Sequence, residues 1–151
     1  MPAPFGIVGV RTDGDSVTEI LYLPRSAGEL APRDRLAEAA CAQIACYLED
    51  PDFAFDLPLA PAGTPFQRRV WRLIAAIPRG ATRSYGTLAE ALGSSPRPVG
   101  QACGANRFPL AIPCHRVVAA AGLGGFAHHD AGFHVAVKRW LLRHEGVRLA
   151  A

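Results

Sequence analysis

The net charge of this chain changes sign at a segment rich in proline, alanine and glycine, residues 58–63. Residues 1–62 contain four arginines and ten acidic residues, a net charge of −6, whereas residues 63–151 contain twelve basic and three acidic residues, a net charge of +9. A chain of 151 residues can bury one good core or two small ones. We therefore expect two domains, 1–62 and 63–151, and a polyanionic partner for the basic one. A solvated basic face is the simpler alternative.

The acidic part has the pattern of a small α/β domain. Apolar runs over residues 6–10 and 17–23 predict two strands, and Asp13-Gly14-Asp15 between them has the composition of a hairpin turn. A helix is predicted over residues 33–48, because apolar side chains recur there at helical spacing, at Leu36, Ala40, Ile44 and Tyr47. Residues 53–59 should be extended. We expect this part to be structural and to brace the fold.

The four cysteines, Cys41, Cys46, Cys103 and Cys114, show no CxxC spacing. A disulfide framework or a zinc site is therefore not expected, and a reducing cytosol is the expected compartment. Cys41 and Cys46 should be core residues of the first helix. No apolar run reaches the length of a membrane span, and the N-terminus lacks the pattern of a signal peptide. We expect a cytoplasmic monomer that does not contact membranes.

Two amphipathic helices are predicted at the two ends of the basic part. Thr64-Pro65-Phe66-Gln67 has the pattern of a capping box with proline at the first helical position, and this helix should reach about Ile77. The last helix should end near His144-Glu145-Gly146, because apolar residues recur before that point at helical spacing, at Phe133, Val137, Trp140 and Leu141.

Two shorter helices are predicted between them. Ser84 should cap a helix over residues 85–92 that a glycine ends, and Ser94 or Ser95 should cap another that reaches about Asn106. Two short helices joined by a Gly-Ser turn in a basic segment are typical of a helix-turn-helix, with an ordinary helical hairpin as the alternative. The expected architecture is thus an α/β domain followed by a mostly α, winged-helix-like domain.

The second of these short helices is unusual in its side chains. Glycine inside a helix costs about 1 kcal/mol, yet most residues here are small, namely Val99, Gly100, Ala102, Cys103, Gly104 and Ala105. A helix with a small-residue face can lie deep in a nucleic-acid groove, including the minor groove. Arg97, in its first turn, could contact a phosphate or enter the base stack.

A cysteine with an adjacent histidine lies in Pro113-Cys114-His115-Arg116-Val117, within an apolar segment. The thiolate is the nucleophilic form of cysteine and needs a basic or cationic neighbour, so this pair indicates a reactive thiol. The simpler interpretation is a buried structural cysteine in a strand. In a regular strand the two side chains would point to opposite faces, so direct contact requires a bend or a bridging water.

Glu145 is the candidate third member of this set. It lies near a helix C-terminus, where the macrodipole disfavours an anion, so a compensating partner is expected, either His115 or an arginine. Cysteine, histidine and glutamate together can act as nucleophile, base and orienting group.

These segments resemble the O6-alkylguanine-DNA alkyltransferases (methylated-DNA–protein-cysteine methyltransferases). Pro113 to Val117 is similar to the active-site motif of that family, and further segments are similar in the same order. They are Thr64-Pro65-Phe66-Gln67, Ser84-Tyr85, Arg97-Pro98-Val99-Gly100, Asn106 with Pro109, and Lys138 to Gly146. The resemblance covers residues 63–148 densely, whereas the acidic part agrees only in length and pattern.

The resemblance implies a DNA-repair enzyme that binds duplex DNA through its helix-turn-helix in the minor groove. It would flip an O6-alkylated guanine (O4-alkylthymine is a further candidate) into a pocket while Arg97 fills the gap. The alkyl group would pass irreversibly to Cys114, so that each molecule reacts once, and no cofactor would be needed. Flipping is required because the target atom lies within the base stack.

The resemblance also implies roles for individual residues. His115 would take the thiol proton through a water, with Glu145 orienting the imidazole, while Tyr85 would donate to the base. The other implied site residues are Asn106, bracing the active-site loop; Ser84, Arg83, Gly100 and Gln101, binding DNA; Pro109, Val117 and Phe126, lining the pocket; and the backbone of Cys114, Val117 and Ala127, contacting guanine. Arg116 would be mainly structural.

The chain departs from the family pattern at three places. Phe126 stands where tyrosine is usual, residues 127–134 replace a shorter glycine-rich turn, and Pro98 replaces a small residue. His128, His129, Asp130 and His134 are ligand types for a metal, but their spacing matches no strong signature, and a solvated loop is the expected alternative.

Two other functions remain open from the sequence. A non-catalytic protein of the same fold that binds alkylated guanine is the first, although the presence of Cys114 argues against it. A thiol hydrolase is the second, but it lacks a papain-type signature and leaves the basic helix pair unexplained. If Cys114 does accept an alkyl group, overpacking should destabilise the product by about 1–3 kcal/mol.

Overall fold

The computed structural model describes residues 1–120, 122–124 and 132–149. Its acidic part contains a three-stranded antiparallel sheet in the order β1-β2-β3, formed by Pro2–Ala3, Gly6–Thr12 and Val17–Leu23. A short 3-10 helix follows over Arg25–Ala27, and then helix α1 over Arg35–Glu49. The expected small α/β layout is therefore confirmed, with a first strand that the sequence pattern did not reveal.

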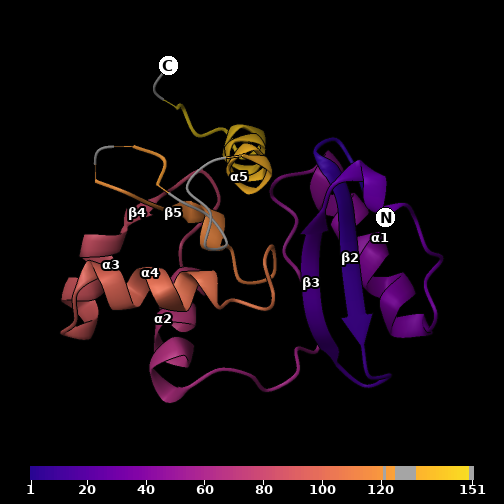
Figure 1. Cartoon of the computed structure of the whole chain (residues 1–151), viewed down its shortest axis with the longest axis horizontal. Coiled ribbons are helices and arrows are strands. Elements are labelled where there is room, and N and C mark those ends of the chain that lie inside the picture. Colours follow the sequence, from indigo (N-terminus) through magenta and orange to yellow (C-terminus); the bar gives the residue numbers. More distant parts are fainter. Residues whose placement is uncertain (121, 125–131, 150–151) are drawn as a thin grey trace.

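Helix α1 packs along the sheet, as Figure 1 shows on its right-hand side. Asp34 caps the helix by accepting a hydrogen bond from the amide of Ala37. The predicted face of α1 is buried at Ala40, Ile44 and Tyr47. Cys46, in contrast, is exposed, so its assignment to the core was wrong, and Cys41 is only partly buried. The reason is helical geometry, since Cys46 lies two residues beyond Ile44 and so points about 200° away from it.

The basic part begins with helix α2, Pro65–Ala75. Its capping box is complete, because the Thr64 hydroxyl accepts from the Gln67 amide and the Gln67 side chain accepts from the Thr64 amide. Gly63, before the cap, has a φ of +87°, and a Cβ there would lie 2.6 Å from the Trp71 ring. Only glycine therefore fits this turn without strain.

Helices α3 and α4, Tyr85–Leu92 and Pro96–Gly104, form the predicted pair of short helices. Ser84 caps α3, and Gly93 ends it in the left-handed conformation. Ser95 occupies the capping position of α4, but its side chain makes no capping hydrogen bond. The Trp71 indole donates to the carbonyl of Ala102 at 2.8 Å, which fixes α4 against α2.

The segment that carries the cysteine is a turn and not a strand. Cys114–Arg116 forms a 3-10 helix, and only Val117–Val118 is extended, as strand β5. Strand β5 pairs in parallel with β4, Arg83–Ser84, directly before α3. This pairing brings the start of α3 beside the cysteine turn.

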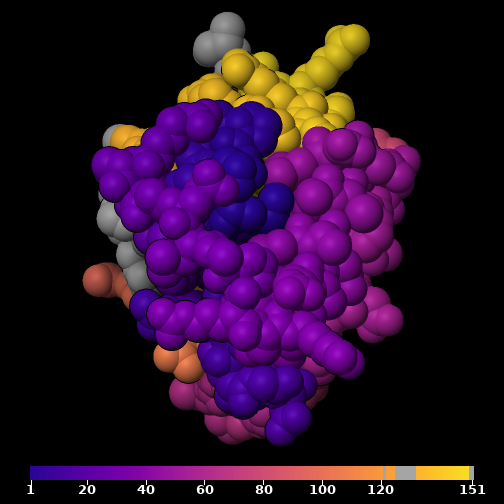
Figure 2. Space-filling model, turned by 90° about the vertical axis from the view of Figure 1, so that its right-hand side faces the viewer, coloured from indigo at the N-terminus to yellow at the C-terminus, as the bar shows by residue number. Residues whose placement is uncertain are grey.

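Helix α5, Phe133–His144, lies above α2 and α4 in Figure 1, beside the upper end of the acidic part. The side opposite α3 is covered largely by the acidic part, with α5 along its upper edge (Figure 2). Hydrogen bonds also join the two parts, since the amide of Ile20 on β3 donates to the carbonyl of Arg107 at 2.8 Å. Among the described residues, no helix has the length and apolarity that a membrane crossing needs.

We expect Gly63→Ala to lower the free energy of unfolding more than Gly28→Ala does. Both glycines have positive φ, which costs a side-chain-bearing residue about 1–2 kcal/mol. At Gly28, however, no described atom lies within 4 Å of an added Cβ, whereas at Gly63 the Trp71 ring would be overpacked, adding about 1–3 kcal/mol. Urea denaturation of both variants measures the difference, and equal losses would contradict the proposed clash.

Candidate active site

The thiol of Cys114 lies at the first position of the 3-10 turn, only 6% exposed. Asn106 holds the loop before it, because its amide group donates to the carbonyl of Ile112 and its oxygen accepts from the amide of Phe108. The Asn106 side chain also acts on the Cys114 thiol, opposing the rise in its pKa that burial causes. Leu110, inside this loop, has a φ of 75°, a strained value for a residue other than glycine. The loop therefore places the thiol in a fixed position.

Beside the thiol, His115 and Glu145 form a buried pair. The two side chains are 1% and 0% exposed, and Nε2 of His115 lies 2.8 Å from Oε2 of Glu145. Arg116 binds the same carboxylate with two nitrogens, Nε at 2.8 Å and Nη2 at 2.9 Å. The 3-10 turn bends the backbone between the cysteine and the histidine, and Glu145 has both of the partners that were considered for it.

A fourth donor reaches this carboxylate from the acidic part of the chain. The Tyr47 hydroxyl, on α1, donates to Oε2 of Glu145 at 2.6 Å. Burial by itself raises the pKa of Glu145, but hydrogen bonds from His115, Arg116 and Tyr47 hold it well below its ordinary value. Glu145 is therefore ionised and acts as an acceptor only.

The ionised carboxylate determines the tautomer of His115. Burial lowers the pKa of His115, with Glu145 opposing the shift, so the ring is neutral near neutral pH. Because Nε2 faces an acceptor, we assign the ring proton to Nε2 and the basic lone pair to Nδ1. Nδ1 is buried, and no described group hydrogen-bonds to it. The arrangement leaves a base available on the ring.

Lys138 on α5 adds a buried positive charge. The side chain is 0% exposed, and its ammonium donates to the carbonyl of Val117 at 2.7 Å. Burial lowers the pKa of Lys138 to about 8, while the nearby thiols of Cys114 and Cys103 act in the opposite direction. Burial likewise raises the pKa of the Cys114 thiol, and the Asn106 side chain and the Lys138 charge counteract this rise. Lys138 therefore favours a thiolate at Cys114.

Tyr85, at the start of α3, lies beside Lys138 and Gly124. The Lys138 ammonium lies 5.8 Å from the centroid of the Tyr85 ring. A Cβ on Gly124 would lie 3.2 Å from that ring, so glycine permits close packing there. Pro109 and Val117 are buried, and their place in a substrate pocket stays a prediction. Phe126 and Ala127, the other expected pocket residues, lie outside the described residues.

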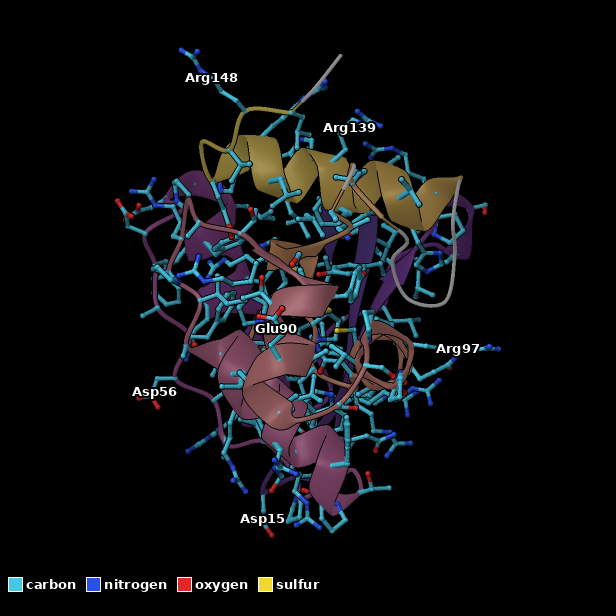
Figure 3. The ribbon with its side chains drawn as sticks, turned by 90° about the vertical axis from the view of Figure 1, so that its left-hand side faces the viewer. Asp15, Asp56, Glu90, Arg97, Arg139 and Arg148 are labelled. Atoms are coloured by element: carbon cyan, nitrogen blue, oxygen red, sulfur yellow. The ribbon has the colours of Figure 1, made fainter. Side chains whose placement is uncertain are left out.

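The expected DNA-contacting residues lie around α3 and α4. Arg97 and Gln101 are exposed on α4, and Arg97 points away from the protein (Figure 3). A Cβ on Gly100 would meet no described atom within 4 Å. Because glycine has no side chain, the backbone of α4 is accessible at this position, and we call this the low surface of α4. Arg83 is exposed, whereas the Ser84 hydroxyl is already engaged in capping α3.

The metal alternative concerns residues of which most lie outside the described part of the chain. No group of three or more potential ligands occurs among the described residues. Of the four candidate ligands, only His134 is described, whereas His128, His129 and Asp130 lie outside the described residues.

Tyr47 and Lys138 were not identified from the sequence as site residues. The sequence nevertheless contains a feature that could have identified each of them. Tyr47 was placed on the buried face of its helix, and a buried tyrosine hydroxyl usually has a hydrogen-bond partner. Lys138 lies at helical spacing from Leu141 and Glu145, on the buried face of α5, where an ammonium requires a partner.

We expect Glu145→Gln to destabilise the protein by about 3–5 kcal/mol at pH 7, because Arg116 would lose a buried ionic partner. The pKa of Glu145 is lower in the folded than in the unfolded state, so its stabilisation is present above the ordinary value of 4.5 and declines as the pH falls below it. The difference between variant and parent in urea denaturation should therefore shrink in acid.

Glu90→Gln, on the exposed surface of α3, is the matched control and should change stability by less than about 0.5 kcal/mol. A pH-independent effect of Glu145→Gln would contradict the charge assignment.

Comparison with known proteins agrees with this geometry. Residues 65–147 match the family described as 6-O-methylguanine DNA methyltransferase, DNA binding domain. The methylated-DNA–protein-cysteine methyltransferase of Shigella flexneri is 48% identical over 95 residues, which are 62% of this chain and 53% of that protein. The chain thus spans about half the length of this curated relative.

Two crystal structures are similar over almost the whole chain. The O6-methylguanine methyltransferase of Mycobacterium tuberculosis has 32% identity and a TM-score of 0.79, covering 100% of this chain and 93% of that one. The structure of the same organism's protein in complex with DNA has 32% identity and a TM-score of 0.78. The similarity covers 97% of this chain and 90% of that one. The chain therefore belongs to the 6-O-methylguanine DNA methyltransferase family.

Proposed function

We propose that this protein repairs duplex DNA by moving the alkyl group of O6-alkylguanine irreversibly to Cys114, once per molecule. The observation that carries the proposal is the buried set of Cys114, His115 and Glu145, in which the imidazole is hydrogen-bonded to an ionised carboxylate next to a fixed thiol. Family membership supports the same reaction. The whole set comes from one chain, so a monomer suffices.

The proposed chemistry begins with the thiol proton. Nδ1 of His115 takes this proton through a bridging water, and Glu145 stabilises the imidazolium that forms. The thiolate then attacks the alkyl carbon, so that a sulfur–carbon bond forms and the carbon–O6 bond breaks. Guanine leaves with the electron pair, and hydrogen bonding to its developing charge, to which the Tyr85 hydroxyl contributes, lowers the barrier.

Lys138 has two roles in this scheme. Its charge favours the Cys114 thiolate, and its hydrogen bond holds the Val117 carbonyl. The carbonyl of Val117, together with that of Cys114, is proposed to accept from the exocyclic amine of guanine. Each carbonyl already accepts one hydrogen bond, that of Cys114 from the amide of Val117. A carbonyl oxygen has two lone pairs, so each can accept a second donor.

Helices α3 and α4 are proposed to act as a helix-turn-helix, with α4 in the minor groove. The low surface at Gly100 would let the helix backbone approach the groove closely, and the exposed Arg97 would occupy the gap left by the flipped guanine. The complex of a structural relative with DNA supports a DNA partner. Residues 63–151 would thus bind DNA and transfer the alkyl group, in the cytoplasm, with residues 1–62 as the structural support.

A lesion-binding protein that does not transfer the alkyl group is the second candidate. It would use the same helices and the same flipped base, and the departures at Phe126 and in residues 127–134 leave it open. The intact Cys114–His115–Glu145 arrangement favours transfer.

We expect incubation with duplex DNA containing O6-methylguanine to add one methyl group per molecule, on the peptide that contains Cys114. Intact-protein and peptide mass spectrometry measure this transfer. Cys114→Ala should abolish it, whereas Cys46→Ala, at an exposed cysteine, should leave it unchanged. Tight and lesion-selective binding without transfer would instead establish the second candidate.

We expect Arg97→Ala to slow methyl transfer from duplex DNA by about tenfold or more, because inserting a side chain offsets a few kcal/mol of unstacking. Arg148→Ala is the matched control, since Arg148 is also exposed but lies beyond α5, away from α4 (Figure 3). Single-turnover rates on the same duplex compare the two. Equal rates for both variants would contradict the proposed insertion.

A further inference from the structure

One oxygen of Glu145 accepts three of the four hydrogen bonds made to this carboxylate. Oε2 receives the Tyr47 hydroxyl at 2.6 Å, His115 Nε2 at 2.8 Å and Arg116 Nη2 at 2.9 Å. Oε1 receives Arg116 Nε at 2.8 Å. Tyr47 and His115 therefore donate to the same atom, although Tyr47 belongs to α1 in the acidic part of the chain.

The position of Tyr47 is fixed by contacts other than its hydroxyl. Its side chain is 2% exposed, and its ring packs against Phe55, with centroids 5.5 Å apart. Its backbone carbonyl lies 2.6 Å from Nε2 of His144, whose ring contacts the Tyr47 ring edge-on at 5.1 Å. The end of α1 is thus attached to the end of α5, immediately before Glu145. The Tyr47 hydroxyl is therefore not the only contact that holds the end of α1 against the end of α5.

The shared acceptor couples the hydroxyl to the base. A donor that binds a carboxylate oxygen takes up part of its negative charge. Less charge then remains to stabilise an imidazolium at His115, and the oxygen is held in line with Nε2. The other titratable or charged groups around the pair are Arg116 in the same turn, Lys138 and His144 on α5, Tyr22 on β3, Arg79 after α2, and Cys114. Among them, Arg116 is the other side chain that donates to Oε2.

We propose that Tyr47 is a positioning residue for alkyl transfer, which holds Glu145 against His115 and sets how strongly His115 takes up the thiol proton. This inference rests on the proposed function, and it gives the acidic part a direct influence on the chemistry through one hydroxyl group. Tyr47 acts only through Glu145 and touches neither thiol nor substrate in this scheme.

The test uses Tyr47→Phe in the full chain, which removes the hydroxyl and keeps the ring. Single-turnover methyl transfer from duplex DNA with O6-methylguanine is measured between about pH 5.5 and 9. We expect the plateau rate to fall about tenfold, because Glu145 is no longer held in line with His115 and part of the contribution of general-base catalysis is lost. The acid limb of the plot of transfer rate against pH should move to higher pH. Without the Tyr47 hydroxyl the Glu145 carboxylate keeps more of its charge, and this charge raises the pKa of His115. The Kd for the duplex should stay within about twofold, since Tyr47 is buried.

The pKa of His115 is measured independently of DNA, by NMR titration of the ¹³C-labelled histidines, with His115→Asn to assign the signal. Ile44→Val is the matched control, because Ile44 lies on the same buried face of α1 and has no polar side-chain atom. It should leave the pH profile and the His115 titration unchanged. A structural role of Tyr47 alone would lower thermal stability in both variants without moving either curve.

Tyr47→3-fluorotyrosine provides the reverse test. It also keeps the proposal testable if the Tyr47→Phe variant does not fold. Its more acidic hydroxyl is the stronger donor, so the acid limb and the His115 titration should move to lower pH. If the parent protein transfers methyl groups and neither Tyr47 variant moves the His115 titration, the proposal is wrong. If the parent protein transfers none, the proposed function fails, whereas a shifted His115 titration would still support the coupling.

Discussion

The burial of the Glu145 carboxylate is the constraint on which the rest of the site depends. An ionised carboxylate without partners is very costly in a protein interior, so its four hydrogen bonds are a requirement of folding as well as of chemistry. The donors come from α1 and from the turn that carries Cys114, while Glu145 itself ends α5. One network therefore joins the two parts of the chain and builds the site.

Burial also determines the resting state of the nucleophile. It raises the pKa of the Cys114 thiol and lowers that of His115, so both groups are neutral before substrate arrives. In the proposed reaction, Glu145 and Lys138 would supply the charges that stabilise the imidazolium and the thiolate once the proton moves. A neutral thiol reacts slowly with electrophiles. Its reactive form, the thiolate, arises only when the thiol proton is transferred.

The elements with strong local signals were predicted well. The capping box at Thr64, the cap at Ser84 and the buried face of α1 follow from short-range hydrogen bonding and helical spacing, and the structure contains all three. The signals failed where local patterns are weak. Strand β1 has only two residues, and the side chain of Cys46 faces solvent between two buried positions. The apolar residues around Cys114 could have formed a strand, but two prolines and the Asn106 hydrogen bonds impose a turn.

The sequence by itself determined the family, the two-part organisation of charge and the identity of the Cys–His–Glu candidates, because these depend on residue types and their order. Only the tertiary structure decided which groups meet. Tyr47 reaches Glu145 across 98 positions of the chain, and Lys138 meets the Val117 carbonyl across 21. No local pattern encodes such pairings. They arise because buried polar groups must find partners, and the partner is whichever donor the packing of distant helices brings within reach.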